Sequence, residues 1–130
     1  MSEFIGKTAS VTTTVTENNT ARAARSGSLD VFATPMMIAL MEQAACECLV
    51  GALAEGQTSV GTRIDVAHNA ASPVGAKITA TAVVTGVDGR KIDFDVTASD
   101  GAGEIGKGTH SRFIIDAEKF ITKANSREAS

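Results

Sequence analysis

Glu42 is the first residue whose type and surroundings point to chemistry, because its neighbours three and four positions away along a helix are all apolar. These neighbours are Ile38, Ala39, Ala45 and Cys46. An ionised carboxylate among apolar side chains is costly unless it is paired or takes up a proton. Such a carboxylate can act as a general base or a nucleophile. The sequence leaves a second interpretation open, in which Glu42 belongs to a solvent-exposed stripe shared with Gln43.

His68 is the second candidate, because it follows the apolar row of an expected strand. Between Val60 and His68 the even positions are mostly apolar, so the imidazole points the same way as Ile64 and Val66. An imidazole on that face can move protons near neutral pH. It can equally be a hydrogen-bonded core residue, and the sequence does not separate the two roles.

Thr34 is the third candidate, a hydroxyl directly before Pro35 at an expected helix start. Its oxygen is expected to cap the helix, and it could also serve a substrate. Glu42 is eight residues further on, on roughly the same side and about 12 Å along the axis, so a substrate would have to link the two. Carboxylate, imidazole and hydroxyl beside helix amides form a plausible hydrolytic set.

The elements that must position these groups can be read from the chain. A helix is expected from Thr34 to near Gly56, about 20 residues and apolar on nearly every side, so a sheet must wrap around it. Alternation and β-branched residues predict strands at Thr8–Thr16, Ser59–Ala70, Ala76–Val87, Lys91–Ser99 and Glu104–Ile115. An α+β hotdog fold, an antiparallel β-sheet wrapped around a long central helix, is therefore expected.

The other segments are expected to be loops or short elements. Glu17–Ser28 is polar and is expected to be a loop, Asp116–Lys123 is expected to be a short helix, and the tail over residues 124–130 is expected to be frayed. The glycine triplets Gly101-Ala102-Gly103 and Gly106-Lys107-Gly108 fall between and within strands. They predict turns or close packing rather than a phosphate cradle.

Length and composition exclude several classes of protein. A chain of 130 residues with 43% hydrophobic and 21% charged residues is expected to be a single globular domain over 1–130. With 5 Phe, no Trp, no Tyr and a net charge of −3, it is not expected to bind nucleic acid.

The expected state of the two cysteines and the charged residues within the longest apolar segment bear on the cellular location. Glu42, Gln43 and Glu47 interrupt that segment, so no membrane span is expected. Cys46 and Cys48 are expected to be two small buried residues in a reducing compartment. The first residues do not show the pattern of an export signal, so export is not expected and a cytoplasmic location is.

Four segments together resemble the fluoroacetyl-CoA thioesterase family of hotdog proteins, in the right order along most of the chain. The segments are Val31-Phe32-Ala33-Thr34, Leu40-Met41-Glu42 with Ala45-Cys46, Val60-Gly61-Thr62 with residues 66–73, and Glu104 to Arg112. The resemblance implies a homodimer with active sites at its interface. It also implies hydrolysis of a small acyl-CoA thioester to a carboxylate and free CoA, with no metal and no cofactor beyond the CoA of the substrate.

The resemblance also implies roles for individual residues. The catalytic threonine, glutamate and histidine of the family fall on Thr34, Glu42 and His68. The glycine whose backbone amide binds the thioester oxygen falls on Gly61. Arg112 matches an arginine near the site, and a solvent-facing or ion-paired strand arginine is the other interpretation. His110 belongs to the matching stretch and receives no role.

The chain departs from the family pattern just before the Val-Phe-Ala-Thr motif. Residues 25–30 are polar and contain a glycine where the fluoroacetyl-specific enzyme carries a bulky aromatic, which argues against fluoroacetate selectivity. Pro35 and Gln43 also differ from the family. Two rival functions stay open, a non-catalytic acyl-CoA or small-ligand binding protein and a hotdog dehydratase or hydratase.

Overall fold

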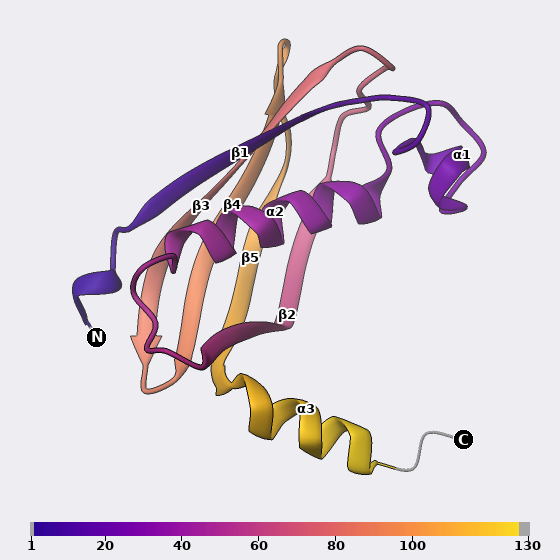
Figure 1. The fold of residues 1–130 in the computed structure, drawn as a ribbon. Coiled ribbons are helices and arrows are strands. Elements are labelled where there is room, and N and C mark those ends of the chain that lie inside the picture. Colours follow the sequence, from indigo (N-terminus) through magenta and orange to yellow (C-terminus); the bar gives the residue numbers. More distant parts are fainter. Residues whose placement is uncertain (1, 128–130) are drawn as a thin grey trace.

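The fold is one five-stranded antiparallel sheet with a helix across its concave face, seen in a computed structural model that describes residues 2–127 (Figure 1). The strands are β1 Thr8–Thr14, β2 Gln57–His68, β3 Lys77–Asp88, β4 Lys91–Asp100 and β5 Gly103–Asp116. Their order across the sheet is β1-β3-β4-β5-β2, which leaves β1 and β2 at the two edges. The α+β layout expected from the sequence is confirmed.

Period-2 alternation builds the sheet face that covers the central helix, α2 (Thr34–Cys48). The inward residues of β3 and β4 are all buried: Ile78, Ala80, Ala82, Val84, Ile92, Phe94, Val96 and Ala98. The small side chains at the middle of β3 leave room for the helix to approach. Met37 and Met41 fill the space between the two layers, and both are fully buried.

Helix α2 differs from its prediction in length and in coverage. It ends at Cys48 rather than near Gly56, and the left-handed φ of 78° at Gly51 turns the chain away from the helix axis. One side of the helix is exposed, along Met36, Ala39, Gln43 and Cys46. The expectation that Cys46 is buried was therefore wrong, whereas Cys48 is buried as expected.

The polar segment expected to be a loop contains a short helix, α1 (Ala21–Ala24). The Thr20 hydroxyl accepts a hydrogen bond from the Ala23 amide at 3.2 Å, which provides an N-cap that the loop prediction did not use. Val31 pairs with Pro73 and Thr20 with Phe32 through single bridges. These contacts tie the segment to the start of α2.

Close packing of β2 against β5 requires a glycine at position 108. A β-carbon there would lie 2.6 Å from the Val66 α-carbon and closer still to the Asp65 carbonyl oxygen. The interpretation of Gly106-Lys107-Gly108 as close-packing glycines is confirmed, because a β-carbon on Gly106 would likewise lie 2.6 Å from the Ala67 carbonyl oxygen.

The two ends of the described chain carry short helices, η1 (Ser2–Phe4) and α3 (Ala117–Ser126). Helix α3 confirms the short helix expected from residue 116 and extends further, so the expected frayed tail does not begin at residue 124. Residues 128–130 of that tail lie outside the described residues, and the single-domain expectation for 1–130 stays a prediction.

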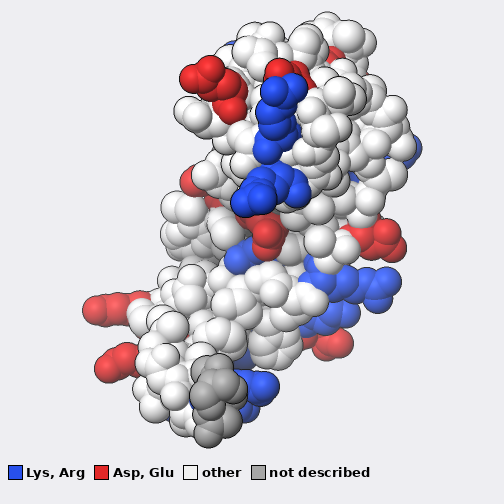
Figure 2. All heavy atoms as spheres, turned by 90° about the vertical axis from the view of Figure 1, so that its right-hand side faces the viewer, with Lys and Arg blue, Asp and Glu red and all other residues white. Residues whose placement is uncertain are grey.

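The distribution of surface charge and the lengths of the apolar helices agree with what the composition predicts. On the face drawn in Figure 2, basic and acidic side chains are interspersed, in keeping with the net charge of −3. Among residues 2–127, no helix is long and apolar enough to cross a bilayer. In the same range, no cluster of three or more His, Cys, Asp or Glu side chains could hold a metal ion.

Candidate active site

The first part of the candidate site is the contact between Thr34 and His68. The Thr34 Oγ1 lies 2.7 Å from Nδ1 of His68, at the point where β2 ends beside the start of α2. The prediction that the Thr34 oxygen caps the helix was wrong, because Ala33 occupies the N-cap and no side chain bonds the first turn. Thr34 stands one position inside the helix, where its hydroxyl reaches the imidazole instead.

The second nitrogen of His68 is left without a partner. Its Nε2 is buried and has no hydrogen-bond partner among the described residues. Burial lowers the pKa of His68, and the nearby Ala70 carbonyl opposes that effect in part. The imidazole is therefore neutral at pH 7. It lines a pocket of about 260 Å³ together with Ser26, Thr34 and Asn69.

The second part of the site surrounds Glu42. Oε2 of Glu42 lies 3.3 Å from Nη1 of Arg112, and the Glu42 side chain is 40% exposed whereas that of Arg112 is 8% exposed. Glu42 is thus half-buried and does not simply share the exposed stripe of Gln43, since a cation binds its carboxylate and a pocket of about 210 Å³ opens beside it. A β-carbon on Gly61 would lie 2.5 Å from Oε2, so the carboxylate rests directly on the glycine.

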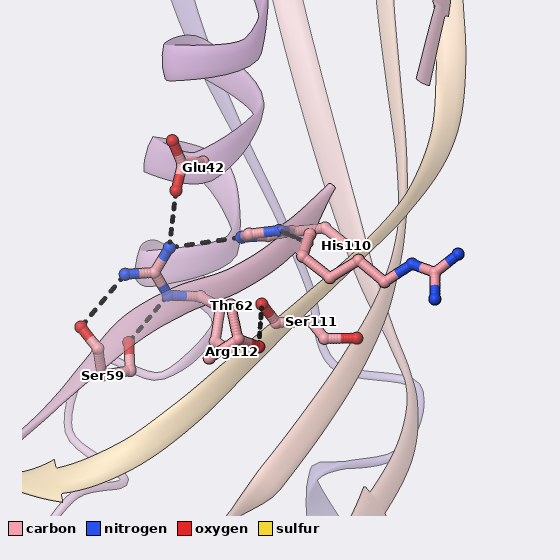
Figure 3. Close-up of polar contacts among 7 residues, drawn as sticks. Glu42, Ser59, Thr62, His110, Ser111 and Arg112 are labelled. Atoms are coloured by element: carbon pink, nitrogen blue, oxygen red, sulfur yellow. Dashed lines mark hydrogen bonds and ion pairs between the residues drawn. The ribbon is translucent and has the colours of Figure 1, made fainter. Parts of the chain in front are cut away.

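Arg112 is anchored by groups that the sequence analysis missed (Figure 3). Its Nε donates to Oγ of Ser59 at 2.8 Å, and its Nη2 donates to the Ser59 carbonyl at 3.0 Å. Its Nη1 also lies 3.2 Å from Nε2 of His110. Arg112 is therefore buried and ion-paired rather than solvent-facing, and its role toward a substrate stays a prediction. Its spacing of two from His110 on β5 was the available signal, since both side chains then share one sheet face.

The two parts of the site do not meet within one chain. His68 ends β2 beside Thr34 at the start of α2, whereas Glu42 lies eight residues further along the helix, about 12 Å on its axis. No hydrogen bond or ion pair between Glu42 and His68 is present, and the two side chains line different pockets. The chain thus positions a hydroxyl–imidazole pair and a carboxylate–guanidinium pair separately.

The chain is similar to known thioesterases over most of its length. The model of the family described as Fluoroacetyl-CoA-specific thioesterase matches residues 15–118. The fluoroacetyl-CoA thioesterase of Streptantibioticus cattleyicolor is 44% identical over 98 residues, which is 75% of this chain and 70% of the relative. A solved structure of the fluoroacetyl-CoA thioesterase has a TM-score of 0.91 and 36% identity, covering 96% of this chain and 97% of that one.

More distant structures share the fold. A thioesterase superfamily member from Thermus thermophilus has a TM-score of 0.86 at 26% identity, with 93% and 90% of the two chains covered. A hot-dog-like protein from Thermanaerovibrio acidaminovorans has a TM-score of 0.88 at 26% identity, with 98% and 96% covered. The hotdog fold is confirmed, and thioester hydrolysis is favoured over the binding and dehydratase alternatives. By family match and by identity, the chain belongs to the fluoroacetyl-CoA-specific thioesterase family.

Proposed function

We propose that this acyl-CoA thioesterase hydrolyses small acyl-CoA thioesters with Glu42, His68 and Thr34 as its catalytic groups. The observation that carries the proposal is the position of the Glu42 carboxylate, which rests on Gly61, is bound by Arg112 and is open to a pocket. A carboxylate with one oxygen bound and a side exposed to ligand can activate water or attack a carbonyl.

Gly61 is proposed to bind the thioester oxygen through its backbone amide. The pairing of β2 with β5 shifts register between Gly61 and Arg63, so the ladder is irregular beside the glycine. Bulges of this kind often stand next to active sites, because they interrupt regular strand pairing. An amide aimed at the developing oxyanion is worth about 3 to 4 kcal/mol in transition-state stabilisation.

The proposed reaction conserves atoms and protons along either of two routes. In the first, Glu42 takes a proton from water, the water oxygen bonds to the carbonyl carbon, and the carbon–sulfur bond breaks. In the second, Glu42 attacks directly, CoA leaves, and water hydrolyses the resulting anhydride. In both, the sulfur leaves as a thiolate that takes a proton, and neutral His68 held by Thr34 orients or transfers protons. No metal or further cofactor enters either route.

A second copy of the chain is proposed to join the two parts of the site. β2 is an edge strand of 12 residues, and an unpaired edge is a template for another chain. In an antiparallel pairing about a two-fold axis between Ile64 and Asp65, His68 of one copy would lie opposite Gly61 of the other. The imidazole with its free Nε2 would then approach the other copy's Glu42.

The acyl group is proposed to be small and not selected for fluorine. Ser26 contributes to the pocket beside Thr34 and His68, and Leu29 nearby is 65% exposed. A polar segment at this place does not provide the apolar enclosure that selectivity for fluoroacetyl would need.

The proposed location is the cytoplasm. Cys46 is a free and exposed thiol, and such thiols persist in a reducing compartment.

The proposed activity is tested with a panel of acyl-CoA thioesters and detection of released thiol. We expect turnover of short acyl chains by the wild type and its loss in Glu42→Gln, which keeps the size of the side chain and removes its charge. Binding of the substrate to Glu42→Gln should stay measurable by calorimetry. Binding without turnover in both proteins would instead indicate a binding module.

A further inference from the structure

His110 is a buried histidine for which the proposed mechanism has no use. It is 2% exposed, and its ring stacks on Phe94 with centroids 5.8 Å apart and an angle of 28° between the planes. Its Nδ1 lies 2.7 Å from the Arg63 carbonyl oxygen, and its Nε2 lies 3.2 Å from Nη1 of Arg112. Both ring nitrogens are therefore satisfied, and the ring is fixed in place.

The partners of His110 determine its protonation. A carbonyl oxygen can only accept a hydrogen bond, so Nδ1 carries a proton and donates it to Arg63. A guanidinium can only donate, so Nε2 is unprotonated and accepts from Arg112. The imidazole is neutral, with its proton on Nδ1.

The charged groups that face this ring are Arg112 and Glu42. Burial lowers the pKa of His110 most, the Arg63 carbonyl opposes that effect, Arg112 lowers the pKa further and Glu42 raises it. The net direction is downward, which agrees with the neutral ring that the hydrogen bonds require.

His110 and Glu42 therefore share one nitrogen of Arg112. Nη1 has two hydrogens, and the contacts to His110 at 3.2 Å and to Glu42 at 3.3 Å use both. Ser59 holds Nε and Nη2 on the other side of the guanidinium. Arg112 thus reaches Glu42 through one nitrogen and one oxygen, whereas free arginine–carboxylate pairs are often bidentate.

We propose that His110 is a positioning residue: it accepts a hydrogen bond from Arg112 and, together with Ser59, fixes the rotation of the guanidinium so that it binds only one oxygen of Glu42. The second carboxylate oxygen stays free for water or for the thioester carbon. This role rests on the proposed function of Glu42, because it concerns the geometry of that carboxylate.

Two substitutions separate the two nitrogens of the ring. In His110→Gln the side-chain amide reaches the place of Nε2 and can accept from Arg112. In His110→Asn it reaches only the place of Nδ1 and keeps the bond to Arg63. We expect kcat to fall about tenfold or more in His110→Asn with KM changed by less than about threefold, and His110→Gln to recover most of the loss.

Ile78→Val is the control for loss of packing alone. Ile78 is fully buried on β3, where it pairs with the far edge strand β1. This variant should lower Tm without lowering kcat. Equal kcat losses in His110→Asn and His110→Gln that follow their Tm values would overturn the proposal, since a structural role alone predicts that pattern.

Nitrogen-15 correlation spectra of the imidazoles test the protonation directly, and the chain has only 2 His to assign. At pH 7 we expect His110 to carry its proton on Nδ1 only. A proton on Nε2 would overturn the proposal whatever the kinetics. If the wild type lacks thioesterase turnover, the proposed function fails as well, whereas wild-type kcat in His110→Asn removes only the role of His110.

Discussion

The carboxylate of Glu42 rests on the α-carbon of Gly61, with 2.5 Å between its Oε2 and the place a β-carbon would take. A new methyl group would meet the flexible end of Glu42 first and, at 3.3 Å each, the side chains of Arg112 and His110, and none of these atoms is backbone. The space over Gly61 therefore belongs to the carboxylate, and position 61 can be altered without disturbing the sheet.

Gly61→Ala should therefore separate activity from stability. The added methyl displaces the Glu42 carboxylate, and misplacement by about 1 Å can cost about a hundredfold in rate. We expect kcat to fall by that order while the free energy of unfolding in urea changes by less than about 1 kcal/mol. An unchanged kcat would show that the carboxylate does not act from this position.

Thr34 offers a test of the contact with His68. Thr34→Ala removes the 2.7 Å hydrogen bond to Nδ1, and a neutral hydrogen bond is worth about 1 kcal/mol, so a loss of kcat of roughly fivefold is expected. Thr34→Ser keeps the hydroxyl and should retain most of the activity. Since the hydroxyl does not cap α2, neither change should lower Tm by more than a few degrees. A similar kcat in both variants would argue against a catalytic role for the Thr34 hydroxyl.

The proposed sharing of each site between two copies predicts complementation between two inactive variants. Glu42→Gln and His68→Asn should each lack activity alone. If each site takes Glu42 from one copy and His68 from the other, mixed dimers contain one intact site, and an equal mixture refolded together should recover about a quarter of wild-type turnover. Sites built within one chain would leave the mixture inactive. Light scattering on the wild type should give the mass of a dimer.

Much of the fold follows from local sequence, whereas the contacts within the site do not. Alternation along residues 78–96 depends only on neighbours in the chain, so the strands and their buried faces could be predicted. Thr34 looked like a helix cap because capping is also local, and its contact with His68 arises only when β2 ends beside α2. The anchoring of Arg112 by Ser59 depends on the pairing of β2 with β5, and the shifted register at Gly61 is not visible in the pattern of side chains.

Stability should depend on pH through His68. Its pKa is lowered in the folded protein by burial, so below the ordinary value of 6.5 the unfolded chain binds a proton more readily than the folded one. The free energy of unfolding should therefore decrease as pH falls from 7 through the range below 6.5, and the loss should end once the folded protein is also protonated. Urea titrations at constant protein concentration should show a shallower decrease in His68→Asn than in the wild type. An identical slope would mean that burial of His68 has no such effect.

Gly108 should be the glycine on which stability depends most directly. Its missing β-carbon makes room for the Val66 α-carbon and the Asp65 carbonyl of β2, and these are backbone atoms that cannot swing aside. Gly108→Ala should lower the free energy of unfolding by about 1 to 3 kcal/mol or more, as overpacking does. Gly101→Ala is the matched control, because a β-carbon there meets nothing within 4 Å and the change should stay within about 0.5 kcal/mol. Equal effects at the two positions in urea unfolding would show that β2 and β5 are not packed as closely as described. Because β2 carries both Gly61 and His68, loosening its pairing with β5 should also lower turnover, in step with the population of folded protein.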